Sequence, residues 1–184
     1  MVSKRLTCTL ALVGLLAGCG DSSDHVSVIG LHDGSLINGH IGLNDDKATL
    51  RVEGSPDAVI SAAGDFSIDA KPVTVDASQR TLLQTYYRNV AGIRDHGIET
   101  GKEGAATAGV ALKSVASGLA NGDTGQIDKQ VNAQADKVKQ AAMKICQDLA
   151  DIEATQNTLA AQLPAFKPYA GLVADSDVRD CRKD

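Results

Sequence analysis

Histidine is the first residue type in this chain whose positions could support chemistry. Three of the four histidines lie close together among aspartates: His25, His32 and His40 beside Asp24, Asp33, Asp45 and Asp46. Imidazoles and carboxylates together can hold a divalent metal. The spacings match no standard ligand pattern, however, and the same residues suit solvated turns. We therefore predict no metal site here.

Catalytic and cofactor motifs are also missing from the sequence. It contains no Gly-x-Ser-x-Gly elbow, no His-Glu-x-x-His pair and no Gly-x-x-x-x-Gly-Lys phosphate loop. The stretch NGDTGQID (121–128) resembles the start of a calcium loop, but Asn132 stands where such a loop needs glutamate. Helix capping explains this stretch better. We predict no catalytic residue, no cofactor and no enzymatic activity.

The N-terminus has the three zones of a secretion signal. Lys4 and Arg5 are positive, Leu6 to Leu16 form an apolar run, and small residues follow at Ala17-Gly18. A lasting transmembrane helix needs about 20 apolar residues, so this run is too short to be one. The sequence therefore predicts a cleaved leader.

Cys19 directly follows this leader, and the block LAGC (16–19) resembles a bacterial lipobox. In that motif the thiol is alkylated by diacylglycerol and the chain is cut before the cysteine. We predict a lipoprotein signal peptide at residues 1–18, with Cys19 as the lipidated residue and membrane anchor. An ordinary secretory signal is the alternative. Gly20 stands where Asp commonly retains a lipoprotein at the inner membrane, so we expect the outer membrane, facing the periplasm.

Two cysteines remain once Cys8 leaves with the signal and Cys19 takes lipid. Cys146 and Cys181 would then meet an oxidising compartment, where disulfides persist. We predict a structural disulfide between them; two free thiols or a redox site is the alternative.

The remaining chain is acidic and poor in aromatic residues. Loss of Lys4 and Arg5 would move the formal charge from −5 to −7, and the chain contains no tryptophan. Nucleic acids need basic clusters and gain from aromatic stacking. We therefore exclude nucleic acid as a partner.

The apolar pattern divides this part of the chain into strands followed by helices. After a polar tether (19–25), residues 26–75 show short alternating runs separated by turn residues, including a hairpin turn at Asp69-Ala70-Lys71. Asp76 and Gln79 form a capping-box helix start. We predict one α+β domain over 26–184, with a small antiparallel β-meander (26–75), an antiparallel helical hairpin (76–163) and a fold-back tail (164–184).

The hairpin is predicted from a glycine- and alanine-rich segment followed by a heptad repeat. Gly97, Gly101 and later small residues predict a kink or break near 97–104, since glycine weakens helices. Beyond Asn121-Gly122, with Asp123 and Gln126 as a second capping box, apolar residues recur every seven positions until Pro164. We expect the members Val138, Ile145 and Ile152 to pack against Leu112, Val115 and Leu119 of the same chain. An intermolecular coiled coil is the alternative.

Two segments resemble the YggN-like family of uncharacterised proteobacterial proteins, which are periplasmic or lipid-anchored. They are GDFSIDAKPVTVDASQRTLLQTYYRNV (64–90) and KICQDLADIEATQNTLAAQLPAFKPYA (144–170), within a similarity that covers roughly residues 45–170. Relatives often carry glycine where Ala70 stands. The resemblance supports the predicted fold and the predicted cellular location, and it implies no activity.

These observations together lead to an expected cellular location and an expected role in binding. We expect a lipid-anchored envelope protein with a structural or protein-interaction role, monomeric or weakly homo-oligomeric, with a possible envelope protein as partner. The alternative is a module that binds a small apolar ligand or lipid in a groove between sheet and helices.

Overall fold

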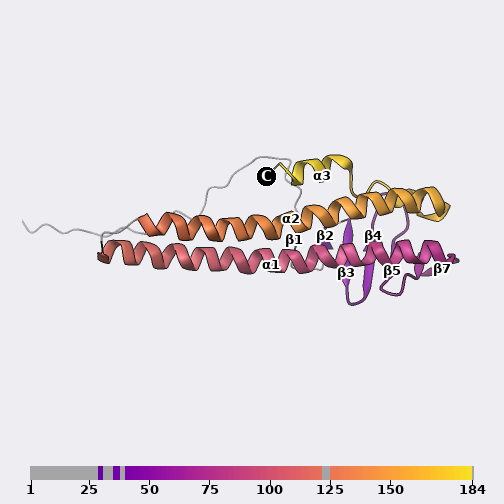
Figure 1. Cartoon of the computed structure of the whole chain (residues 1–184). Helices are drawn as coiled ribbons and strands as arrows, with labels where there is room; N and C mark the ends of the chain where they lie inside the picture. Colours follow the sequence, from indigo (N-terminus) through magenta and orange to yellow (C-terminus); the bar gives the residue numbers. More distant parts are fainter. Residues whose placement is uncertain (1–28, 31–34, 38–39, 122–124, 184) are drawn as a thin grey trace, which may run out of the picture.

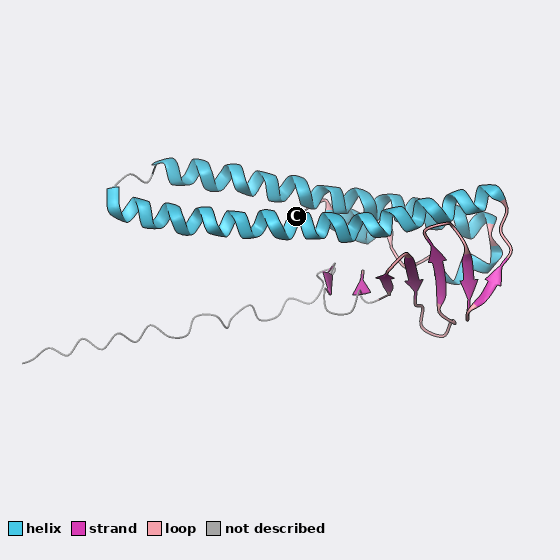
Figure 2. Cartoon of the chain, turned by 90° about the horizontal axis from the view of Figure 1, so that it is seen from below, coloured by secondary structure: helices cyan, strands magenta, loops and turns pink. Residues whose placement is uncertain are grey.

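A computed structural model describes residues 29–30, 35–37, 40–121 and 125–183 of the chain. Within them, an antiparallel sheet lies against one end of a long helical hairpin (Figures 1 and 2). The predicted α+β arrangement, strands first and helices after, is confirmed.

The sheet is a simple meander in which each strand pairs with the next along the chain. The strands are β1 (Ile29–Gly30), β2 (Ser35–Leu36), β3 (Ile41–Asn44), β4 (Lys47–Leu50), β5 (Ala58–Ser61), β6 (Phe66–Ile68) and β7 (Lys71–Val73). Alternation places Ala48 and Leu50 of β4 opposite Ile60 and Ala58 of β5, and all four side chains are fully buried. The sheet therefore presents one apolar face, as alternating sequences dictate.

The hairpin turn between β6 and β7 lies at Asp69-Ala70, within the predicted turn. Both residues have positive φ, 50° and 59°. Two-residue hairpin loops favour this conformation because its twist matches that of the strands, although alanine adopts it at a cost that glycine avoids.

Two long helices follow the sheet. α1 spans Ala77–Asn121 and α2 spans Gly125–Gln162. The predicted capping box at the start of α1 is confirmed: Gln79 N donates to Asp76 Oδ1 (2.8 Å), and Asp76 N donates to Gln79 Oε1 (3.0 Å). The second capping box lies outside the described residues, because Asp123 is not among them.

The predicted break near 97–104 is wrong, since α1 continues through Gly97, Gly101 and Gly104. Each glycine costs a helix about 1 kcal/mol relative to alanine. Packing of α2 alongside α1 (Figure 1) supplies the tertiary contacts that offset this cost.

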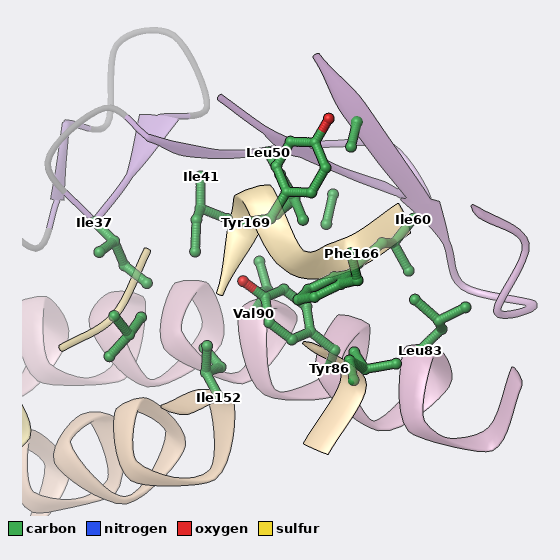
Figure 3. Packing of buried hydrophobic residues seen from close by; sticks show 14 of the residues in the cluster. Ile37, Ile41, Leu50, Ile60, Leu83, Tyr86, Val90, Ile152, Phe166 and Tyr169 are labelled. Carbon is green, nitrogen blue, oxygen red and sulfur yellow. The ribbon is translucent and has the colours of Figure 1, made fainter. Parts of the chain in front are cut away.

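The core lies where the first half of α1 crosses the sheet (Figure 3). Leu83, Tyr86, Val90 and Ile93 of α1 are fully buried, and they recur at helical spacing. The 3₁₀ helix η1 (Pro164–Tyr169) inserts Phe166 and Tyr169 into the same core.

Aromatic rings connect these elements. The Phe166 ring lies 5.7 Å from Phe66 and 5.8 Å from Tyr86, centroid to centroid. The Tyr169 hydroxyl donates to the Pro56 carbonyl at 2.7 Å, so the ring stays in the core while its polar atom is satisfied.

The tail folds back along α2, as predicted. Gln156, in α2, is 1% exposed and bonds the backbone of Val173 through both its amide nitrogen and its amide oxygen. The short helix α3 (Asp175–Cys181) buries Val178. It also brings Cys181 to Cys146 as a disulfide, with Cα atoms 5.6 Å apart.

The heptad repeat packs within the chain, but not where the sequence placed it. Ile145 and Ile152 are buried, whereas Val138 is only half-buried and Leu112 is 74% exposed. The predicted contact with Leu112 is therefore wrong, and the side chains of Val115 and Leu119 lie outside the described part. The reason is the register: the middle of α2 lies beside His96 and Glu99, not beside the end of α1.

Candidate functional site

Half of the helical hairpin extends beyond the sheet. We call residues 98–121 of α1 and 125–144 of α2 the distal half. In Figure 2 the strands lie beneath the other half, which holds the start of α1 and the end of α2. The sheet order places β1 at one edge of the sheet and β7 at the other.

A part-buried histidine–carboxylate pair lies where the two halves of the hairpin meet. His96 Nδ1 is 2.6 Å from Asp148 Oδ2, and the two side chains are 30% and 14% exposed. Burial raises the pKa of the Asp148 carboxyl above its usual value, although the hydrogen bond from His96 opposes this shift. The pair therefore fixes one position of α2 against α1.

Gly92 makes this close approach possible. A Cβ at this position would lie 2.8 Å from Asp148 Oδ2 and 3.0 Å from its Cγ. The carboxylate therefore occupies the space that any side chain at position 92 would need.

A second ion pair lies next to the first along the hairpin. Lys144 Nζ is 2.9 Å from Glu99 Oε2, and its hydrogen bond lowers the pKa of Glu99. Both side chains are about half exposed, so solvent screening leaves this pair little net energy. It specifies register more than stability.

The disulfide holds the tail at the same level of α2. Cys146 lies two residues before Asp148 and is 3% exposed. The structure thus brings the predicted pair Cys146 and Cys181 together, and the bond attaches α3 to α2 beside the His96–Asp148 pair. The middle of the hairpin is fixed, and the distal half extends from it.

The distal half carries the exposed large hydrophobic side chains of the described residues. They are Ile98, Leu112 and Met143, with exposed fractions of 43%, 74% and 45%. A single exposed apolar residue is ordinary on a protein surface. Because all three belong to the two helices of the distal half, we take this half as the candidate contact surface. The candidate site is therefore the surface of the distal half.

Most of the other residues that the sequence singled out lie outside the described part of the chain. Cys19, His25 and His32 lie outside the described residues, and His40 is exposed. Among the described residues no group of three or more His, Cys, Asp or Glu side chains could hold a metal ion. Within those same ranges, no helix is long and apolar enough to cross a membrane.

Sequence reasoning missed the His96–Asp148 pair. The two residues are 52 positions apart and belong to no motif. Their helical faces could be read from the sequence, but their contact depends on the register between the helices. No local signal specifies that register.

Comparisons with known proteins do not identify the site. No family model, curated protein or solved structure matches this chain.

Proposed function

We propose that this chain is a lipid-anchored protein of the bacterial cell envelope with a structural or protein-interaction role. Residues 1–18 would direct export, Cys19 would carry the lipid, and the molecule would face the periplasm from the outer membrane. Membership of the YggN-like family is part of the proposal. The distal half of the hairpin is the surface that we assign to a protein partner.

The observation that carries the proposal is the position of the exposed hydrophobic side chains. Ile98, Leu112 and Met143 all belong to the distal half by residue number, and Figure 2 shows the strands beneath the other half of the hairpin. Extending two helices past the sheet exposes apolar surface without adding to the main core, which is costly unless another molecule covers it.

The alternative of a small apolar ligand between sheet and helices receives less support. The space where α1 crosses the sheet is filled by large side chains: Phe66, Tyr86 and Phe166 are each at most 2% exposed. Figure 3 shows these layers in contact. Ligand sites are concave and open to a ligand, whereas this interface is packed.

Site-directed crosslinking in intact cells tests the proposed role. A photo-crosslinking amino acid replaces either Leu112, on the distal half, or Ala62, an exposed residue in the turn between β5 and β6. We expect a discrete protein adduct from position 112 and none of the same mass from position 62. Identical adducts from both positions, or no adduct from position 112, would contradict an interaction role for the distal half.

A further inference from the structure

The C-terminal tail is attached to the rest of the fold in two different ways. Its first part is held without covalent bonds: Tyr169 lies in the core, and Gln156 bonds the backbone of Val173 through both ends of its amide. Its second part, α3, is joined to α2 by the Cys146–Cys181 disulfide. The two parts of the tail therefore depend on different interactions.

α3 itself buries little surface against the rest of the fold. Of its seven residues, Val178 is buried at 7% exposure, Asp177 and Cys181 are half-buried, and the others are exposed. Val178 and Cys181 are three positions apart, so they share one face of the short helix. Only this narrow face of α3 is turned toward α2.

The charged side chains of α3 pair within the tail. Arg179 pairs with Asp175 one turn earlier, and Lys183 pairs with Asp180. All four side chains are at least 60% exposed. Within the described ranges, no ion pair or hydrogen bond joins a side chain of α3 to a side chain of α2. Val178 and the disulfide are therefore the interactions that hold α3 on α2.

One buried valine is not enough to hold a segment of this size. Its burial compensates the conformational entropy lost by roughly two ordered residues, whereas α3 orders seven. A helix this short does not persist by itself, because isolated helices of fewer than about 12–15 residues are marginal in water. The disulfide supplies the difference, since it keeps Cys181 beside Cys146 in every conformation of the oxidised chain.

We propose that the Cys146–Cys181 disulfide is a redox latch on α3. While the bond is intact, α3 stays on α2. When a dithiol reductant opens the bond, α3 leaves α2 and the rest of the fold stays in place. The released segment begins after Val173, because the contacts of Val173 with Gln156 need no covalent bond. This inference does not depend on the interaction role proposed for the distal half.

Thiol–disulfide exchange opens the latch in two steps. Cys181 is half-buried whereas Cys146 is 3% exposed, so we expect a thiolate of the reductant to attack Cys181 Sγ. This step forms a mixed disulfide and releases Cys146 as a thiolate, which takes up a proton. The second thiol of the reductant then attacks the reductant's own sulfur in the mixed disulfide and releases Cys181. Two electrons pass to the protein, and the reductant becomes a disulfide.

Opening the latch changes the surface of α2. Val173 lies at Gln156 and Cys181 lies at Cys146, so the tail runs antiparallel to α2 over this stretch (Figure 1). Release of α3 uncovers the side of α2 that carries Cys146, next to the distal half. We therefore expect reduction to alter the surface of the hairpin while its two helices remain packed together.

Hydrogen exchange read by mass spectrometry tests the latch. The mature protein, purified in detergent, is labelled for seconds with and without dithiothreitol, so that amides freed by local opening dominate the signal. On reduction, we expect residues 176–183 to exchange at least about tenfold faster, whereas η1 and α2 keep their protection. Unchanged exchange in α3 would overturn the proposal, since α3 would then hold without the bond. Faster exchange throughout η1 and α2 would overturn it too, because the bond would then support the whole fold.

Cys181→Ser separates loss of the bond from other effects of the reductant. In this variant α3 should exchange as fast without dithiothreitol as it does in the reduced wild type, and adding dithiothreitol should change nothing further. Far-UV circular dichroism checks that the long helices are retained. A Cys181→Ser protein whose α3 exchanges as slowly as that of the oxidised wild type would reject the latch.

Discussion

We predict that the part-buried carboxylate of Asp148 makes the stability of the hairpin depend on pH. Burial raises its pKa above the usual value of 3.8, against the opposing hydrogen bond from His96. Between the usual pKa and the raised one, the folded state keeps a proton that the unfolded chain has released. The free energy of unfolding from this group therefore falls as pH rises through that window.

Replacing Asp148 with Asn tests this residue directly. Asn cannot ionise but can still accept a hydrogen bond from His96. The decline in the free energy of unfolding that Asp148 causes as pH rises should therefore disappear. The free energy of unfolding of Asp148→Asn minus that of the wild type should rise as pH increases from about 4 toward neutral. Urea denaturation across this range measures the difference.

Asp136→Asn is the matched control, because Asp136 is exposed on the same helix. Its difference from the wild type gives the baseline for replacing an exposed carboxylate of α2 by an amide. Carboxylates common to both proteins cancel in each difference. Equal pH profiles for the two variants would contradict a special role for Asp148.

Among the elements, the structure divides α1 into a half that supports the core and a half that does not. Ile145 of α2 is 7% exposed and packs within the supported region, whereas Leu112 is 74% exposed in the distal half. The two residues come from the same sequence-based expectation, which placed them in contact.

Alanine substitutions should separate these two residues. Ile145→Ala removes a buried side chain, so we expect the free energy of unfolding to fall by about 2–5 kcal/mol. Leu112→Ala removes a side chain already in solvent and should cost less than about 0.5 kcal/mol at concentrations where the chain is monomeric. Chemical denaturation at low micromolar concentration compares them. Equal losses would mean that the end of α1 is buried after all.

The elements themselves could be predicted because their signals are local. The alternation before Val75, the Asp76–Gln79 capping box and the stop at Pro164 each act over a few residues, and the structure confirms all three. The turn at Asp69-Ala70 belongs to this group too. Interactions this short in range leave a visible pattern in the sequence.

The contacts between elements could not be predicted in the same way. A heptad repeat tells which face of α2 is apolar but not which half of α1 it meets, so Leu112 was assigned to the wrong partner. The His96–Asp148 pair could not be predicted for the same reason, because it too depends on the register between the two helices. The glycines of α1 led to the wrong prediction of a helix break for a related reason. Helix propensity is a local property, whereas the packing against α2 that outweighs it depends on residues far along the chain.

At the scale of the whole molecule, the proposed membrane anchor would be combined with an exposed helical extension. The sheet and the first half of α1 form the stable body, and the disulfide between Cys146 and Cys181 fixes the tail to it. The distal half extends from this body. Anchoring through Cys19 would hold that surface close to the membrane, where envelope partners are found.

The measurement that tests this account most directly is the mass and location of the mature protein with and without Cys19. We predict that the wild type fractionates with the outer membrane and begins at a Cys19 whose mass is raised by diacylglycerol and an acyl chain. Cys19→Ser should lose the added mass and either become soluble or keep residues 1–18 uncleaved. Unchanged membrane fractionation together with an unchanged mass of the mature N-terminal peptide would contradict the account.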